Sequence, residues 1–177
     1  ARILRPQDVL RGRSDREFFS TDVFDSGVVA AAVIRPGSIE ILARSIAAVT
    51  RAKYAVFPRG GGLSYTKGYL PERPNSVVID TTHLNDIVEV NTTDMYVVVE
   101  AGVTWHQLYE RLRPERVRTP FFGTGSGLYA TVGGTLSQNA MNYGSTRFGP
   151  ASESVLGLEV VLADGRRVIL GSAATPY

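Results

Sequence analysis

Short apolar runs separated by polar turns follow one another from residue 28 onward, and their spacing predicts alternating strands and helices. Residues 28–34 form an apolar run closed by Arg35-Pro36-Gly37, which suits a buried strand followed by a turn. Ser38 can cap the next helix, whose buried face would carry Ile39, Leu42, Ile46 and Val49. A second apolar run at residues 54–57 then completes a strand–helix–strand unit.

The rest of the chain continues this mixture of strands and helices. Thr104 begins a capping-box pattern with Gln107 and predicts a helix to about Leu112. The dipeptide Asp164-Gly165 predicts a hairpin turn between two apolar runs. Residues 1–27 have little pattern and are predicted to be an irregular arm. Further strands are expected at residues 76–80, 87–90, 95–100, 158–163 and 167–170, in a sheet that mixes parallel and antiparallel pairs.

Three consecutive glycines directly after the second predicted strand are the first chemical signal. Gly60-Gly61-Gly62 would stand at a carboxyl end of the sheet, where α/β proteins bind ligands. Glycine reaches positive φ without steric cost, so successive amides can point into one concavity that binds an anion. Arg59 adds a fixed cation with a bidentate fork. The loop therefore predicts a site for a phosphate group.

Gly60-Gly61-Gly62 could simply form a bulge or a tight turn. A second tract rich in Gly, Ser and Thr, at residues 123–144, weakens that explanation. It precedes an amphipathic run at residues 136–140 whose helix N-terminus could also face an anion. Two such loops can hold opposite sides of one extended diphosphate. Leu63-Ser64 stand where a P-loop needs Lys and Ser or Thr, and the spacing of a dinucleotide fingerprint is absent.

Composition limits the remaining classes. The chain has 177 residues, 44% of them hydrophobic and 20% charged, which is typical of a folded soluble protein, and we expect it in the cytoplasm. It has no cysteine, so disulfides and thiolate sites within it are excluded. A net charge of +2 gives no reason to propose nucleic acid, and no carboxylate cluster suggests a metal. We expect no apolar membrane span and no signal peptide.

Four blocks of sequence, in order, resemble the FAD-binding domain of the vanillyl-alcohol oxidase and p-cresol methylhydroxylase family. This family also contains D-lactate dehydrogenases and glycolate oxidase subunits. The resemblance covers most of residues 28–170. The blocks are Pro58-Arg59-Gly60-Gly61-Gly62-Leu63-Ser64-Tyr65, Val99-Glu100-Ala101-Gly102-Val103-Thr104, Thr131-Val132-Gly133-Gly134, and Val155-Leu156-Gly157-Leu158-Glu159-Val160-Val161-Leu162-Ala163-Asp164-Gly165.

The resemblance implies an α+β fold of two lobes, at about residues 28–90 and 91–177, with mixed sheets, flanking helices and FAD between the lobes. The main chain at Val160 would meet the adenine. The pyrophosphate would be wrapped by Pro58, Arg59, Gly60, Gly61, Gly62, Leu63, Ser64 and Tyr65. The ribityl chain and the approach to the flavin ring would be lined by Pro120, Gly123, Ser126, Gly127, Thr131, Gly133, Gly134, Ser137, Asn139 and Gly144.

Two departures from the family change what is implied. Some relatives attach FAD through a histidine where this chain has Leu63, so FAD should be non-covalent. The sequence also stops at Tyr177, before the segment that normally closes the flavin domain and before the cap domain that covers the substrate. The chain therefore resembles part of a larger protein, and it carries no residue that we assign as catalytic.

The implied function is an FAD-dependent oxidase or dehydrogenase that moves a hydride from a small substrate to the flavin. Family frequency favours a 2-hydroxy acid, then a phenolic alcohol. The electron acceptor (oxygen, a cytochrome or a quinone) and the oligomeric state stay open. A nucleotide-binding module without redox activity and a plain α+β domain are the alternatives. His83 and His106 fit ordinary loop and helix positions, while Tyr143 and Arg147 could face the flavin or a substrate carboxylate.

Overall fold

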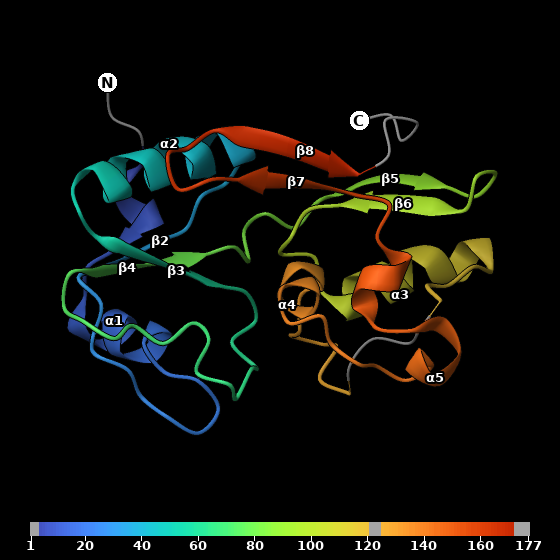
Figure 1. Ribbon diagram of the computed structural model, residues 1–177, viewed down its shortest axis with the longest axis horizontal. Helices are drawn as coiled ribbons and strands as arrows, with labels where there is room; N and C mark the ends of the chain where they lie inside the picture. Colours follow the sequence, from blue (N-terminus) through green and yellow to red (C-terminus); the bar gives the residue numbers. More distant parts are fainter. Residues whose placement is uncertain (1–3, 121–124, 172–177) are drawn as a thin grey trace.

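The computed structural model describes residues 4–120 and 125–171 (Figure 1). Its N-terminal part is more regular than the sequence suggested. A 3-10 helix at Pro6–Asp8 leads into the short strand β1, Val9–Leu10, and then into helix α1, Arg13–Phe19. The prediction of an irregular arm over residues 1–27 is therefore wrong for these segments. Local pattern missed them because β1 and α1 are short and gain their order from packing on the sheet.

The first sheet has the strand order β1-β2-β4-β3. Strands β2 (Ala32–Ile34), β3 (Ala55–Arg59) and β4 (Ser76–Asp80) are parallel, and β1 pairs with β2 in the antiparallel sense. The strand predicted at residues 28–34 is thus confirmed only at its end. All five residues of β4 are buried, as expected for a central strand covered on both faces.

Helices cover the two faces of this sheet. Helix α2, Ile39–Arg51, begins at Ser38, whose hydroxyl accepts a hydrogen bond from the Ile41 amide as predicted. Figure 1 shows α2 on one face and α1 on the other. Alternate residues of the strands separate the two cores. Ile34, Val77 and Ile79 pack with Leu42 and Val49 of α2, and Val33 and Val78 pack with Phe19 of α1.

Strands β5 (Ile87–Asn91) and β6 (Tyr96–Val99) are found where the sequence predicted them, but they form a separate antiparallel hairpin. The expectation that they join the parallel strands is therefore wrong, and the antiparallel pair of the first sheet comes from β1. This hairpin spans the lobe boundary expected near residue 90. The division into two lobes remains a prediction.

The second core is built around helix α3, Trp105–Leu112, which a 3-10 turn at Arg113–Glu115 follows. Its predicted capping box is present. Trp105 and Leu108 are buried together with Val103 and Val132. The Trp105 indole Nε1 donates a hydrogen bond of 2.8 Å to the Thr135 hydroxyl, which satisfies its buried polar group.

Three short helices and one hairpin complete the fold. Helix α4 is Val132–Ser137, α5 is Ser145–Phe148, and a 3-10 helix is Ala151–Ser154. The helix predicted over residues 136–140 therefore begins earlier, because Thr131 caps it by accepting from the Gly134 amide. None of the helices among the described residues is long and apolar enough to cross a membrane.

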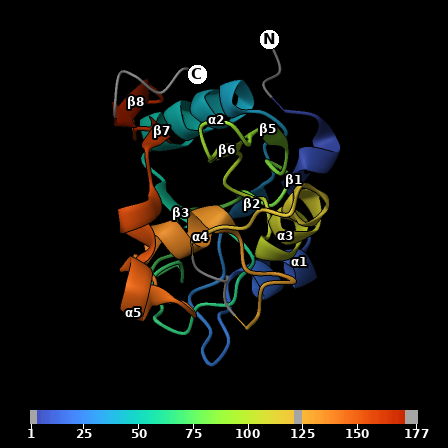
Figure 2. The ribbon, with the colours of Figure 1, turned by 90° about the vertical axis from the view of Figure 1, so that its right-hand side faces the viewer.

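The predicted hairpin at Asp164-Gly165 is confirmed as strands β7 (Gly157–Val161) and β8 (Arg167–Gly171). Its turn rests on α2, and both views place the two elements side by side (Figures 1 and 2). The Thr50 hydroxyl of α2 donates a 2.7 Å hydrogen bond to the Ala163 carbonyl. The last strands of the chain are thereby fixed against the first parallel unit.

The capping box of α3 gives a test of this account. The Thr104 hydroxyl accepts from the Gln107 amide at 3.2 Å, and the Gln107 side chain accepts from the Thr104 amide at 2.8 Å. Replacing Thr104 by Ala should lower the free energy of unfolding by about 1 kcal/mol, because the Gln107 amide in the first turn loses its side-chain acceptor. Denaturant titration measures this. Thr92→Ala, in the exposed β5–β6 turn, should change it little, and equal effects of the two variants would contradict the assignment.

Candidate functional site

The glycine loop lies at the carboxyl edge of the parallel sheet, as predicted. Strand β3 ends at Arg59, which is in register with Asp80 at the end of β4. Gly60 follows at once, and residues 60–64 are half-buried between the edge of the sheet and the second glycine-rich tract. This edge is where ligands bind in parallel α/β sheets.

The two glycine-rich tracts pack closely against each other at Gly60 and Gly61. A Cβ on Gly60 would run into the Thr131 hydroxyl, and a Cβ on Gly61 would run into the Tyr129 carbonyl oxygen. Any side chain at these positions would therefore push the tracts apart. The sequence predicted that both tracts serve one site, and the geometry brings these parts of them together.

The amides of this loop are available to a ligand. Within residues 4–120 and 125–171, no backbone amide of residues 60–65 donates a hydrogen bond to another described group. Backbone amides without a protein acceptor can bind an anion, so this run is a candidate anion site. Leu63 and Ser64 are half-buried in the loop, whereas Tyr65 is 69% exposed and lies against the Phe24 ring.

The guanidinium of Arg59 is buried, although the sequence suggested a cation that could bind a phosphate directly. Its residue is only 7% exposed, and its guanidinium lies among the rings of Phe18, Phe19 and Tyr69. Burial, which is the largest influence, lowers the pKa of Arg59, and the nearby Tyr69 and Asp80 act in the opposite direction. The cation therefore stands behind the loop and not on an open surface.

The first half of the second tract supports the loop and helix α3. The Ser126 carbonyl accepts from the amides of Tyr129 and Ala130. The Gly127 carbonyl accepts from the His106 amide at 3.0 Å. Gly133 packs on Ala101, where a Cβ would come within 2.7 Å of the alanine side chain. Gly133 thus allows the backbone of α4 to pack closely on residue 101.

Other predicted residues of this tract have local roles in the structure. Ser137 donates a 2.8 Å hydrogen bond to the Gly133 carbonyl within α4, and the Asn139 side chain accepts from the Ser152 amide. Gly144 has a φ of 102° at the start of α5. Pro120 is exposed, with its carbonyl accepting from Arg118. Gly123 lies outside the described residues. Contact of these residues with a cofactor remains a prediction.

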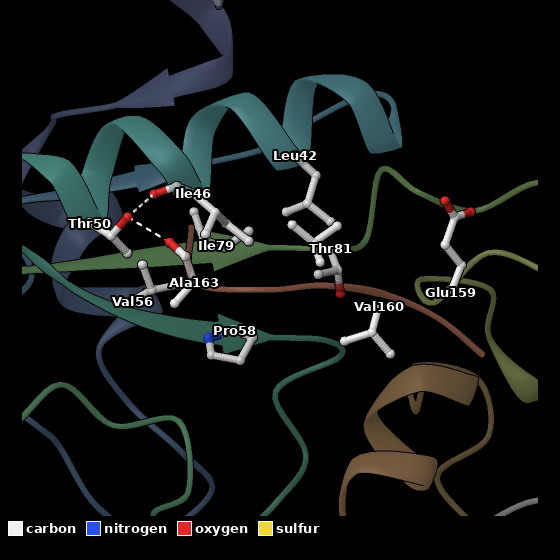
Figure 3. A pocket seen from close by; sticks show the side chains of 11 residues that line it. Leu42, Ile46, Thr50, Val56, Pro58, Ile79, Thr81, Glu159, Val160 and Ala163 are labelled. Atoms are coloured by element: carbon white, nitrogen blue, oxygen red, sulfur yellow. Dashed lines mark hydrogen bonds between the residues drawn. The ribbon is translucent and has the colours of Figure 1, made fainter. Parts of the chain in front are cut away.

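A cavity of about 380 Å³ lies between α2, β3, β4 and β7, and Pro58 on its wall is two residues before the glycine loop (Figure 3). Its walls are mostly apolar, and it brings together two residues that the sequence placed in one site, Pro58 and Val160. The Glu159 carboxylate at its edge accepts a 2.6 Å hydrogen bond from Arg167. The other lining residues are Leu42, Ile46, Thr50, Val56, Ile79, Thr81, Val161 and Ala163.

The secondary candidates do not join this cavity. His83 and His106 are exposed, and the described residues contain no group of side chains that could hold a metal ion. Tyr143 is 73% exposed, and the Arg147 guanidinium lies 5.3 Å from the centre of the Phe148 ring. Their contact with a flavin or a substrate carboxylate remains a prediction.

Sequence reasoning missed the aromatic residues around Arg59. Phe18 and Phe19 belong to residues 1–27, for which the sequence predicts an irregular arm, and Tyr69 lies in a loop without periodic pattern. The adjacent aromatic pair in an otherwise polar stretch was the available signal. It pointed to burial, but no local pattern indicated that its partner was the cation at the end of β3.

Comparison with known proteins identifies the family of this chain. A family model described as an FAD binding domain matches residues 30–171. The chain is 29% identical over 167 residues to D-lactate dehydrogenase (cytochrome), mitochondrial, of Kluyveromyces lactis, covering 90% of this chain and 28% of that protein. It is 34% identical over 164 residues to D-2-hydroxyglutarate dehydrogenase of Escherichia coli, covering 89% and 16%.

Solved structures share the fold. The structure of p-cresol methylhydroxylase with substrate bound has a TM-score of 0.84 at 20% identity, covering 98% of this chain and 34% of that chain. An alkyldihydroxyacetonephosphate synthase has a TM-score of 0.84 at 18% identity, covering 97% and 36%. These likenesses confirm the predicted fold class.

The chain spans less than a third of the length of the D-lactate and D-2-hydroxyglutarate dehydrogenases above. The family match, in contrast, covers both glycine-rich tracts, the cavity and the β7–β8 hairpin. The free loop amides, the backbone contact between the tracts and the buried cation fit a diphosphate-containing cofactor. The chain belongs to the FAD binding domain family whose model matches residues 30–171.

Proposed function

We propose that this chain holds FAD non-covalently in an oxidoreductase that oxidises a small organic substrate. The proposal rests on the run of backbone amides at residues 60–65, which donate no hydrogen bond to another described group. Gly60 and Gly61 let this loop lie close beside the second tract. Such a run can bind a diphosphate with little reorganisation. FAD, when bound, supplies the group that accepts a hydride from the substrate.

The residues around the loop suggest how the cofactor lies. The amides of residues 60–65 would hold the pyrophosphate, and the adenine would enter the cavity between Pro58 and the main chain of Val160. A flat, weakly polar base suits its apolar walls. The second tract, from Ser126 to Gly144, would then line the ribityl chain and the approach to the flavin ring.

Leu63 carries the proposal that the cofactor is not bonded to this loop. A leucine side chain has no nucleophilic atom, and the chain has no cysteine. Retention of FAD would then depend on hydrogen bonds, charge and the apolar cavity. Since each of these is reversible, unfolding should release the cofactor.

A 2-hydroxy acid is our first choice of substrate, because two similar proteins are named as D-lactate and D-2-hydroxyglutarate dehydrogenases. A phenolic alcohol is the second choice, since p-cresol methylhydroxylase and a 4-ethylphenol oxidase share the fold. The electron acceptor stays open among oxygen, a cytochrome and a quinone. We keep the cytoplasm as the expected location, although one similar protein is named mitochondrial.

The spectrum of the full-length protein tests the redox proposal. The purified protein should show flavin absorption bands, and anaerobic addition of D-lactate or D-2-hydroxyglutarate should bleach them. A colourless protein that takes up no added FAD would refute cofactor binding. Stable colour with every candidate 2-hydroxy acid and phenolic alcohol would instead favour a binding module without redox activity.

Denaturation tests the mode of attachment. Acid precipitation of the holoprotein should leave all the yellow colour in the supernatant, because Leu63 offers no atom for a bond to the flavin. Absorption of supernatant and pellet at the flavin bands measures this. Colour retained on the polypeptide would overturn the non-covalent proposal.

The contact between the tracts predicts a strong effect of one methyl group. Gly61→Ala should weaken FAD binding about tenfold or more, because its Cβ would displace the Tyr129 carbonyl and so move the loop amides. Fluorescence titration of the apoprotein with FAD measures the dissociation constant. Gly37→Ala is the matched control, since its Cβ would meet no atom within 4 Å. Equal affinities of the two variants would contradict the assigned contact.

A further inference from the structure

The side chain of Arg59 lies behind the glycine loop, against Gly62. Its guanidinium carbon lies 5.3, 5.0 and 5.5 Å from the ring centres of Phe18, Phe19 and Tyr69. The two phenylalanines come from α1 and meet edge to face, with centres 5.2 Å apart. A planar guanidinium suits such an aromatic environment because it is weakly hydrated and stacks on rings.

The charge of Arg59 lacks a close counter-ion within the described residues. No carboxylate of residues 4–120 or 125–171 comes within 4.0 Å of it, and its Nε has no hydrogen-bond partner there. Asp80 is buried nearby, but its Oδ1 accepts hydrogen bonds from the Thr82 amide at 3.0 Å and the Thr82 hydroxyl at 2.7 Å. A buried cation without a close counter-ion raises the free energy of the folded chain, and an approaching anion would lower it.

The same side chain touches the loop that would bind the anion. Gly62 has a φ of 72°, and a Cβ there would run into the Arg59 guanidinium. Tyr69, whose ring centre lies 5.5 Å from the guanidinium carbon, donates a 3.2 Å hydrogen bond from its hydroxyl to the Ser64 carbonyl. Arg59 and Tyr69 thus support the glycine loop at two points.

We propose that Arg59 is a positioning residue that fixes the glycine loop from behind and supplies the buried positive charge that the diphosphate of FAD neutralises. The rings of Phe18 and Phe19 hold this cation, so helix α1 belongs to the cofactor site although it lies outside the loop itself. The inference rests on the FAD binding proposed above.

Arg59→Met in the full-length protein tests the charge. The dissociation constants of FAD and of ADP should both rise about 10- to 100-fold, because both ligands carry a diphosphate that loses one charge-assisted interaction. Titration of the apoprotein with each ligand measures them. Arg13→Met removes an exposed cation at the start of α1, paired with Glu17 and away from the glycine loop, and should leave both constants unchanged. Arg59→Lys should restore only part of the affinity, because an ammonium lacks the planar stacking surface.

Phe18→Ala tests the role of α1 with little risk to the fold, since Phe18 is 61% exposed. The loss of one ring from the cation should weaken FAD and ADP binding about two- to fivefold, with the thermal midpoint of the apoprotein nearly unchanged. This variant decides the question if Arg59→Met fails to fold.

The outcomes separate this inference from the proposed function. A wild-type protein that binds no FAD refutes the function itself. If the wild-type protein binds FAD and either variant binds it equally well, the role of Arg59 is wrong while the function stands. A weakening confined to FAD, with ADP affinity retained, also overturns the inference, because it would place the effect on the flavin and not on the diphosphate.

Discussion

The close approach of Gly60-Gly61 to residues 129–131 is the constraint on which the site depends. It joins the carboxyl edge of the parallel sheet to the tract that opens α4, and it leaves no room for a side chain at either glycine. No backbone amide of residues 60–65 donates a hydrogen bond to another described group, so these amides stay free for the cofactor diphosphate proposed above.

A buried hydrogen-bonded chain keeps the second tract in place for this contact. The Trp105 indole donates to the Thr135 hydroxyl, which donates in turn to the Thr131 carbonyl at 3.1 Å. Thr131 also forms an isolated β-bridge with Thr104, the residue that caps α3. The core around Trp105 and the glycine loop are therefore coupled through Thr131, a residue 2% exposed. Packing in the second core fixes the geometry of the site.

Local signals predicted the elements whose structure is determined locally. Ser38 and Thr104 mark helix starts by their own hydrogen bonds, and Asp164-Gly165 marks a hairpin by its turn conformation. The insertion of β4 between β2 and β3, and the separation of the β5–β6 hairpin, depend on long-range pairing that no local pattern encodes. For the same reason the glycines of the site were predictable, but the aromatic neighbours of Arg59 were not.

The position of Arg59 shows how stability and binding can oppose each other in one site. A guanidinium removed from water without a close carboxylate raises the free energy of the ligand-free chain, and the surrounding rings offset only part of that cost. An anion bound at the loop would offset the rest of this desolvation free energy. Because folding has already placed the cation, binding does not have to repeat that step. Arg59 therefore preorganises the loop at the expense of the ligand-free state, as is common where a binding site and a folded core share residues.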